Sequence, residues 1–256
     1  MPKCSPKPLM FLILSVLLFI SLVANLIIFR SAWLYYKEAN AVRLNPLGLS
    51  FYPTAETQPV EKEPAQKVVV FFGDSRADQW PFPQGPEMDA RFVFVNRGVH
   101  TQTASQVAGR FDAHIRPLQP DILILQMCIN DLKTIPLFPD AREPIIDNCK
   151  ANIAEIVAKS RALGTAVILT TVFPFGPLPP ERRLLWTDDT FTAVEEVNTY
   201  IHSLSGEGVL ILDATPILAD ENGRVKEPYH FDLLHINTAG YDALNQELAK
   251  ILVMVE

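Results

Sequence analysis

The chain has 256 residues and carries 29 acidic against 22 basic residues, which gives a formal net charge of −7. An acidic chain with no basic stripe interleaved with aromatic residues argues against a nucleic-acid-binding protein. The sequence has three cysteines but no CxxC, no HExxH and no glycine-rich phosphate cradle, so we expect neither a metal site nor a cofactor.

The N-terminal region predicts a membrane anchor. After a short tail, residues 1–8, the segment 9–29 is almost wholly apolar, and about 20 such residues span a bilayer. Lys3 and Lys7 precede it without an acid and favour a cytoplasmic N-terminus, although the basic residues after the segment nearly balance them. A cleaved signal peptide is the alternative, but its apolar region would be shorter. We therefore expect a single-pass anchor, with the rest of the protein outside the cytoplasm.

Residues 30–66 are predicted to form a juxtamembrane connector. Four prolines are spaced between residues 46 and 64, and proline-rich segments stay extended and resist helix formation. Apolar residues between Leu47 and Tyr52 could dock on the domain that follows. That domain, residues 67–256, has about 190 residues, enough for one well-buried core.

Within this domain, apolar runs alternate with helical patterns. Runs rich in β-branched and aromatic residues predict strands at 68–72, 92–95, 121–126, 166–171 and 209–213. Apolar residues at helical spacing predict helices at 103–115, 144–163, 191–204 and 238–253. This alternation predicts an α/β domain with a parallel sheet and right-handed crossovers.

Residues suited to ester chemistry follow the first three strands. Ser75 stands at a strand-to-helix turn, where α/β hydrolases expose a nucleophile. Gly98 and Asn130 follow the next two strands and can supply hydrogen-bond donors to an oxyanion. Far downstream, His235 has Asp232 three residues before it. Such a pair can take the proton from a serine hydroxyl. Since ligands bind at the carboxyl ends of parallel strands, we expect one crevice.

These residues lie in four blocks that resemble the SGNH (GDSL) hydrolase, or lipase/acylhydrolase, superfamily, named for a Ser, a Gly, an Asn and a His. The blocks here are Gly73-Asp74-Ser75, Asn96-Arg97-Gly98, Cys128-Ile129-Asn130-Asp131 and Asp232-Leu233-Leu234-His235. The resemblance covers about Lys67 to the C-terminus and implies a flavodoxin-like three-layer α/β/α sandwich with a five-stranded parallel sheet. It also implies a catalytic triad of Ser75, His235 and Asp232. The oxyanion hole would use the N–H groups of Ser75 and Gly98 and the Asn130 side chain.

Three positions depart from the family pattern. Arg76 replaces a leucine and would bring a cation to the mouth of the site as a substrate contact. His100-Thr101 replaces a small Ser-Gly pair, and His100 could line the cleft. Cys128 replaces a glycine, so a positive φ there would strain the loop that carries Asn130. Cys128 and Cys149 could pair in an oxidising compartment, although we favour two buried free thiols.

The predicted function is hydrolysis of a carboxylic ester through an acyl-enzyme on Ser75. The ester is either a lipid acyl ester or an O-acetyl ester of a carbohydrate. The long loop 173–187 offers Leu184, Leu185 and Trp186 to an acyl chain, unless it is a surface excursion with a packed tryptophan. The alternative is a catalytically degenerate member that binds or scaffolds glycans, which the departures at Cys128 and His100 motivate.

Overall fold

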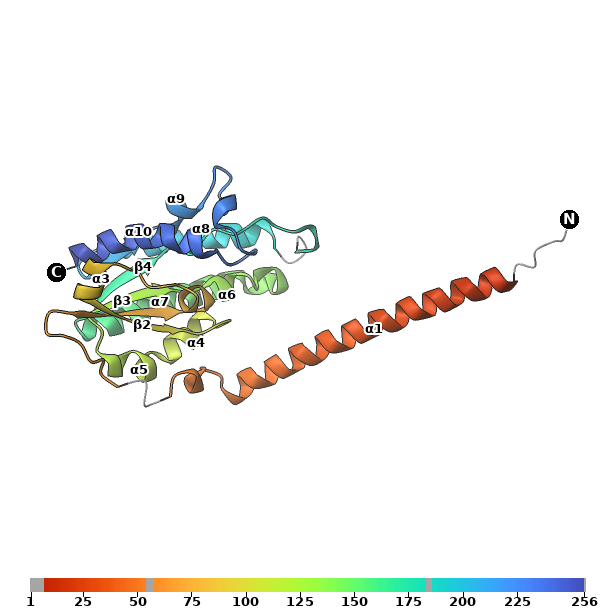
Figure 1. The fold of residues 1–256 in the computed structure, drawn as a ribbon, viewed down its shortest axis with the longest axis horizontal. Coiled ribbons are helices and arrows are strands. Elements are labelled where there is room, and N and C mark those ends of the chain that lie inside the picture. The colour runs from red at the N-terminus through yellow and green to blue at the C-terminus, as the bar shows by residue number, and fades with distance from the viewer. Residues whose placement is uncertain (1–6, 54–57, 183–185, 256) are drawn as a thin grey trace. The chain divides into compact units, whose positions relative to one another are not determined.

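The computed structural model describes residues 7–53, 58–182 and 186–255, and it divides into two compact units, Met1–Pro46 and Leu47–Glu256. The first unit contains one helix, α1 (Lys7–Leu44), of 38 residues, drawn in red to orange in Figure 1. At 1.5 Å per residue α1 is about 57 Å long, against about 30 Å for the hydrocarbon core of a bilayer. Its length and composition suit a membrane anchor and a signal sequence alike.

The helix α1 continues well beyond the apolar segment, so residues 30–44 are helical rather than part of an extended connector. This stretch contains neither glycine nor proline, and Pro46 follows shortly after the helix ends. A proline lacks the backbone N–H that a helix needs and its ring disfavours helical backbone before it. The extended part of the connector is therefore shorter than the sequence predicts.

The second unit contains one sheet of five parallel strands in the order β2-β1-β3-β4-β5. The strands are β1 (Lys67–Gly73), β2 (Phe92–Gly98), β3 (Ile122–Gln126), β4 (Ala166–Thr170) and β5 (Val209–Leu212). This order is that of flavodoxin-like folds. All five predicted strands are present, and the predicted fold class is confirmed.

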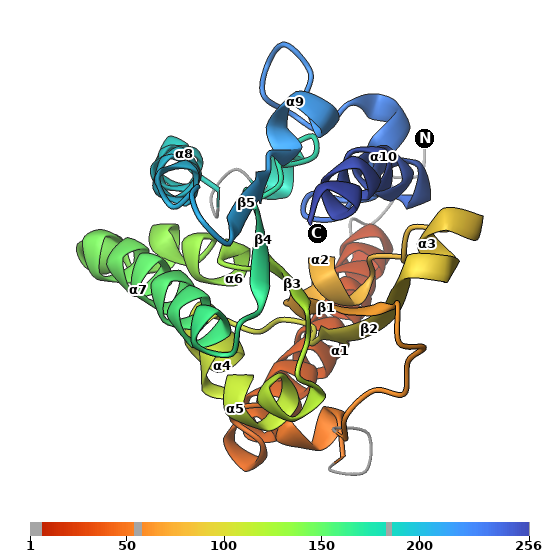
Figure 2. The ribbon, with the colours of Figure 1, turned by 90° about the vertical axis from the view of Figure 1, so that its left-hand side faces the viewer.

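Helices cover both faces of the sheet, which gives the three layers visible in Figure 2. Successive side chains of a strand point to opposite faces, so Val70 and Phe72 of β1 enter one core and Val69 and Phe71 the other. The first core includes α4 (Ala104–Gly109), α5 (Phe111–His114), α7 (Arg142–Ala162) and α8 (Asp188–Ser203). The second includes α3 (Pro86–Arg91), α9 (Ala214–Leu218) and α10 (Thr238–Met254).

Several short helices were not predicted from the sequence. The predicted helix 103–115 is divided into α4 and α5 next to Gly109, a residue with low helix propensity. Besides α3 and α9, the short α2 (Ser75–Asp78) and α6 (Ile129–Leu132) were missed because a single turn shows no periodicity. Short 3₁₀ helices lie at Leu49–Phe51, Arg116–Leu118, Ile135–Leu137, Pro139–Ala141, Pro180–Arg182 and Glu227–Tyr229.

The first residues of the second unit pack against its sheet and helices. The Leu47 side chain lies against Gly109, where an added Cβ would come within 2.7 Å of it. The Tyr52 hydroxyl donates to the carbonyl of Gly98 at 2.5 Å. Two of the side chains expected to dock therefore do so, whereas Phe51 is 63% exposed.

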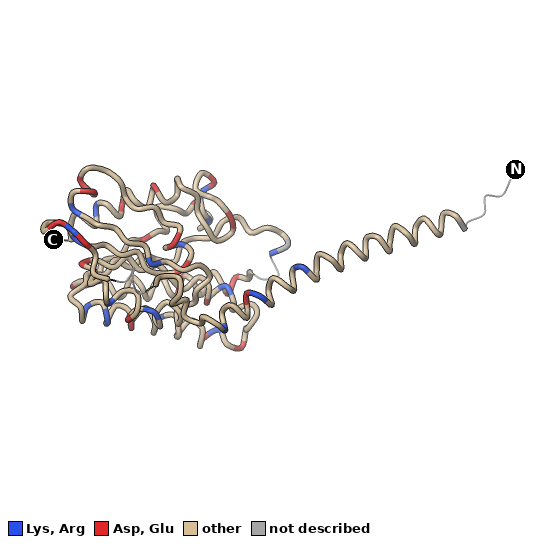
Figure 3. The backbone as a smooth tube through the Cα atoms, turned by 60° about the horizontal axis from the view of Figure 1, so that its bottom comes forward, with Lys and Arg blue, Asp and Glu red and all other residues tan. Residues whose placement is uncertain are grey.

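Charged residues are distributed differently in the two units. After Lys7, its first residue, α1 carries no charged residue until Arg30, as the tan stretch of the helix in Figure 3 shows. In the second unit, Lys and Arg are interspersed with Asp and Glu along the described chain, without a basic stripe.

Candidate active site

Ser75 lies at the carboxyl edge of the sheet, directly beyond β1. It is the first residue of α2, whose N-cap Asp74 accepts a hydrogen bond from the N–H of Arg76 at 2.9 Å. Asn130 lies on α6, beyond the neighbouring strand β3. The strand order reverses between β1 and β3, and in open α/β sheets such a switch point is where ligands bind.

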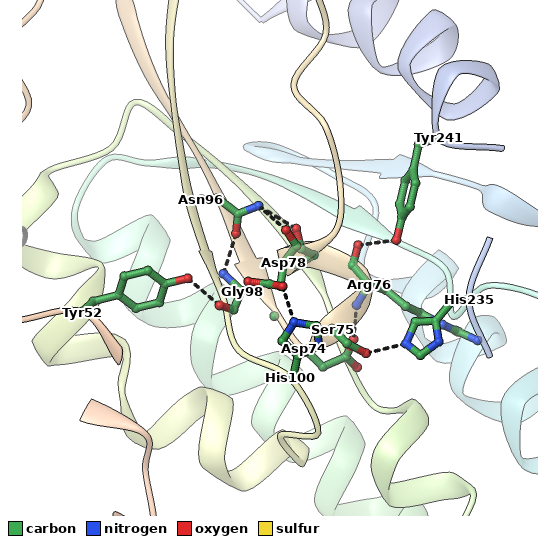
Figure 4. Close-up of polar contacts among 12 residues, drawn as sticks. Tyr52, Asp74, Ser75, Arg76, Asp78, Asn96, Gly98, His100, His235 and Tyr241 are labelled. Carbon is green, nitrogen blue, oxygen red and sulfur yellow. Dashed lines mark hydrogen bonds and ion pairs between the residues drawn. The ribbon is translucent and has the colours of Figure 1, made fainter. Parts of the chain in front are cut away.

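A chain of hydrogen bonds joins Ser75, His235 and Asp232. The Ser75 Oγ lies 2.9 Å from Nε2 of His235 (Figure 4), and Nδ1 of His235 lies 2.9 Å from Oδ2 of Asp232. The carboxylate next to Nδ1 places the proton on that nitrogen and leaves Nε2 to accept the serine proton. The structure thus brings together the three residues that the sequence predicts as a triad.

Asp232 also holds the loop that carries the histidine. Its Oδ1 accepts hydrogen bonds from the N–H groups of Leu234 and His235, both at 2.7 Å. Partial burial acts to raise the pKa of Asp232, but the hydrogen bonds from the His235 ring and from these two N–H groups outweigh it. The pKa is therefore held below its ordinary value. An ionised Asp232 fixes both the tautomer and the position of His235.

The N–H of Gly98 has a partner within the protein. Its N–H already donates to Oδ1 of Asn96 at 2.7 Å, so it is occupied in this structure. Asn96 in turn donates through Nδ2 to the carbonyls of Ala77 and Asp78, which ties β2 to α2. A Cβ at Gly98 would lie 2.1 Å from the backbone nitrogen of Asp78. The glycine is needed for this close approach, and its role as an oxyanion donor stays a prediction.

Asn130 is held in one orientation and retains a donor. Its Nδ2 donates to the carbonyl of Gln102 at 3.0 Å, and its Oδ1 accepts from Nζ of Lys133 at 2.6 Å. A carboxamide has two N–H donors, so the second remains for a ligand. The residue before Gln102, Thr101, has a φ of 62°, which residues other than glycine rarely adopt. Sequence reasoning missed Gln102 and Thr101, although the unusual His100-Thr101 pair marked this loop.

Cys128 combines a positive φ of 89° with a disulfide bond to Cys149. The expectation of two free thiols is therefore wrong. The bond joins the N-cap of α6 to α7, with the Cα atoms 5.8 Å apart. It anchors a backbone conformation that a residue with a Cβ adopts at a cost. The disulfide thereby secures the loop that carries Asn130.

Arg76 supports the histidine loop from inside the domain. It is fully buried, not at the mouth of the site as predicted. Its Nε donates to the carbonyl of Leu234 at 2.9 Å, and Nη1 donates to the carbonyl of Phe173 at 3.2 Å. Burial lowers the pKa of the guanidinium to about 10, against the opposing effect of Asp74. The prediction of a substrate contact is corrected, because the side chain is covered and points at backbone next to His235.

The other two predicted substrate contacts have different surroundings. His100 is exposed and pairs through Nε2 with Oδ2 of Asp78 at 2.5 Å, near Ser75 in Figure 4. Trp186 is 7% exposed, and its ring lies 4.8 Å from that of Phe175 in the core. The prediction that Trp186 lines the cleft is therefore wrong, and the alternative of a packed tryptophan holds. Leu184 and Leu185 lie outside the described residues.

A buried carboxyl group lies next to Asn130. Asp131 accepts a hydrogen bond on Oδ2 from the N–H of Ala104 at 2.8 Å. Burial, reinforced by the nearby Asp74, raises the pKa of Asp131 to about 7. The folded protein therefore keeps a proton on this group between pH 4 and pH 7, where the unfolded chain has lost it.

We expect Asp131→Asn to reduce the dependence of stability on pH. A carboxyl group with a raised folded-state pKa loses stabilisation as pH rises from its unfolded value to its folded value. The wild-type free energy of unfolding should thus fall between pH 5 and pH 8, and the variant should remove about 1 to 3 kcal/mol of that fall. Urea denaturation at both pH values measures it. The exposed Asp242→Asn is the control, and an unchanged slope in Asp131→Asn would contradict the raised pKa.

The structure is thus a flavodoxin-like α/β domain with a hydrogen-bonded Ser–His–Asp arrangement at the switch point of its sheet. The chain belongs to the GDSL-like lipase/acylhydrolase family, whose family model matches residues 71–243. The resemblance found in the sequence is therefore confirmed.

Solved structures share the fold at low identity. A GDSL-like lipase from Bacteroides thetaiotaomicron is 20% identical with a TM-score of 0.65, covering 82% of this chain and 99% of its own. A lipase from a goat rumen metagenome is 14% identical with a TM-score of 0.58, covering 75% and 100%. A catalytic mutant of an acetylxylan esterase from Geobacillus stearothermophilus is 19% identical with a TM-score of 0.52, covering 74% and 95%. No curated protein matches the chain.

Proposed function

We propose that the protein is a serine esterase that hydrolyses carboxylic esters through an acyl-enzyme on Ser75. The observation that carries this proposal is the hydrogen-bond chain from Ser75 through His235 to Asp232 at the switch point of the sheet. Membership of the lipase/acylhydrolase family supports the same reaction class.

The geometry accounts for each proton in the reaction. The Ser75 Oγ attacks the ester carbonyl while His235 Nε2 takes the hydroxyl proton, and Asp232 stabilises the resulting imidazolium. The N–H of Ser75 and the second N–H of Asn130 donate to the oxyanion. His235 then protonates the leaving alcohol. Water, deprotonated by the same imidazole, attacks the acyl-enzyme and releases the acid and free Ser75.

The candidate substrates are acyl esters of lipids and O-acetyl esters of carbohydrates, and we favour an acyl ester of a lipid. Phe231, next to Asp232, is 68% exposed. Leu137 and Phe138, just beyond the helix that carries Asn130, are also exposed. Exposed large apolar side chains suit an apolar ligand, and Phe231 directly precedes Asp232 in the chain. The O-acetyl carbohydrate alternative draws support from the fold shared with an acetylxylan esterase.

We also propose that α1 remains as an uncleaved anchor, with the N-terminus in the cytoplasm and the hydrolase domain outside it. The disulfide between Cys128 and Cys149 supports this placement, because such bonds persist in oxidising compartments and are rare in the cytosol. Anchoring would hold the esterase close to lipid substrates.

The test is a series of p-nitrophenyl esters from acetate to palmitate, assayed on the full chain in detergent beside Ser75→Ala. We expect kcat/KM for octanoate to exceed that for acetate about 10-fold, since each buried CH₂ of an acyl chain contributes up to about 0.8 kcal/mol. Phe231→Ser should reduce this preference without lowering the rate on acetate. A preference for acetate would select the carbohydrate O-acetyl class. Turnover equal to that of Ser75→Ala on every ester would instead support a binding module.

A further inference from the structure

The segment that joins α1 to the hydrolase domain reaches the loop after β2. The Tyr52 hydroxyl donates to the Gly98 carbonyl at 2.5 Å, as Figure 4 shows. The guanidinium of Arg97 lies over the Tyr52 ring at 4.6 Å, and the buried His114 ring meets it edge-on at 5.4 Å. Nε2 of His114 also lies 3.2 Å from the Leu49 carbonyl. These contacts attach residues 47–52 to the end of β2 and to α5.

Gln102 connects this segment to Asn130. Its side chain is buried, donates through Nε2 to the Leu47 carbonyl at 2.9 Å and accepts on Oε1 from Nε of Arg110 at 2.5 Å. Its own carbonyl accepts the hydrogen bond from Nδ2 of Asn130. Both polar atoms of the Gln102 carboxamide are thus hydrogen-bonded, while its backbone carbonyl orients the Asn130 amide.

The same network reaches the nucleophile. Nη2 of the buried Arg110 donates at 2.7 Å to the carbonyl of Gly73, the second residue before Ser75. Arg110 therefore links two groups: the end of β1, which Ser75 follows, and Gln102, which orients Asn130. A shift of Gln102 would therefore move both the Asn130 amide and the end of β1 before Ser75.

Gly48 allows the segment 47–52 to approach the Gln102 side chain closely. It has a φ of 68°, and a Cβ there would come within 2.6 Å of Nε2 of Gln102. A glycine at this position lets the Leu47 carbonyl face the Gln102 side chain, and any larger residue would push the two apart.

We infer that residues 47–52 are a positioning element of the active site and that Gln102 is the positioning residue through which they hold the Asn130 amide. The inference rests on the proposed esterase function. An oxyanion donor contributes through its fixed placement before reaction, so loosening Gln102 should slow the chemical step without much effect on substrate binding. A soluble version of the enzyme should accordingly begin at Leu47 rather than at Lys67.

The test uses the full chain in detergent with the ester that the wild type hydrolyses fastest. Gln102→Leu keeps the side-chain size but removes both of its hydrogen bonds. We expect kcat to fall about 10- to 100-fold with KM within about 2-fold, since loss of an oxyanion donor costs about 10²- to 10³-fold. Tyr52→Phe is the milder variant, with an expected loss of about 3-fold. Met254→Ala, at an exposed position at the end of α10, is the control and should retain wild-type kcat.

A double-mutant cycle separates positioning from general loss of structure. Asn130→Ala should lower kcat about 10²- to 10³-fold, and adding Gln102→Leu should lower it little further, because the two act through one amide. Fully additive losses, or an unchanged kcat in both Gln102→Leu and Tyr52→Phe, would overturn the inference while leaving the esterase intact. If Gln102→Leu does not fold, Tyr52→Phe combined with Asn130→Ala gives the same cycle. Turnover that persists in Ser75→Ala would overturn the proposed function itself.

Discussion

His235→Ala should lower kcat about 10⁴- to 10⁶-fold on the preferred ester, and Ser75→Ala should do the same. The 2.9 Å contact between Ser75 Oγ and His235 Nε2 makes the two side chains one unit, since the hydroxyl cannot attack while it keeps its proton. The double variant Ser75→Ala/His235→Ala should therefore be no slower than either single variant. Steady-state kinetics on the purified full chain would measure all three.

Asp232→Asn should cost less than loss of His235, about 10²- to 10⁴-fold in kcat. An asparagine keeps the side-chain shape and can still accept the backbone hydrogen bonds of the loop, but it loses the charge that stabilises the imidazolium. His202→Ala is a matched control, because His202 lies on α8 and pairs with Asp213, away from the hydrogen-bond chain. A loss in His202→Ala comparable with that in His235→Ala, or additive losses in the double variant, would contradict the assigned roles.

Replacing Cys128 and Cys149 together by alanine should lower the free energy of unfolding by about 2 to 5 kcal/mol. The bond closes a loop between residues 21 apart in sequence, and its loss increases the freedom of the unfolded chain. It also releases the backbone at Cys128, which holds a φ of 89° at the start of α6. We therefore expect kcat to fall with stability, because Asn130 lies two residues further on. Urea denaturation and ester kinetics with and without dithiothreitol would show both effects.

A glycine at position 128 separates these two contributions. Glycine adopts a positive φ without steric cost, so Cys128→Gly/Cys149→Ala should recover most of the catalytic rate while remaining less stable than the wild type. Alkylation of the denatured, unreduced protein should modify one cysteine, Cys4. Modification of three would show that the pair does not form, and the placement of the domain outside the cytoplasm would lose its main support.

The sequence alone was enough to predict the strands and the three residues that the structure joins in a hydrogen-bond chain. The β1 strand is a continuous run of β-branched and aromatic residues, which predicts a strand buried on both faces. Its side chains are indeed buried on both faces of the sheet. Ser75 directly follows this run, and Asp232 stands three residues before His235. These are local patterns, visible in neighbouring residues, and a parallel sheet brings the carboxyl ends of its strands to one edge.

Other features depended on partners far away in the sequence. Arg76 looked like a cation at the mouth of the site, but its buried guanidinium binds the carbonyl of Leu234, 158 residues further on. The sequence also did not show that the N–H of Gly98 donates to the side chain of Asn96. Nothing in the local sequence around Trp186 showed that its ring packs against Phe175 in the core rather than lining a cleft.

What the sequence by itself determined is therefore the set of strands, their parallel arrangement and the grouping of Ser75, His235 and Asp232. The tertiary structure decided which other groups support them, namely the disulfide at Cys128 and the contact of Tyr52 with Gly98 across 46 residues. The physical reason is that backbone propensity and hydrophobic periodicity act between near neighbours. The partner of a buried polar group or thiol, in contrast, is set by how separate elements pack together.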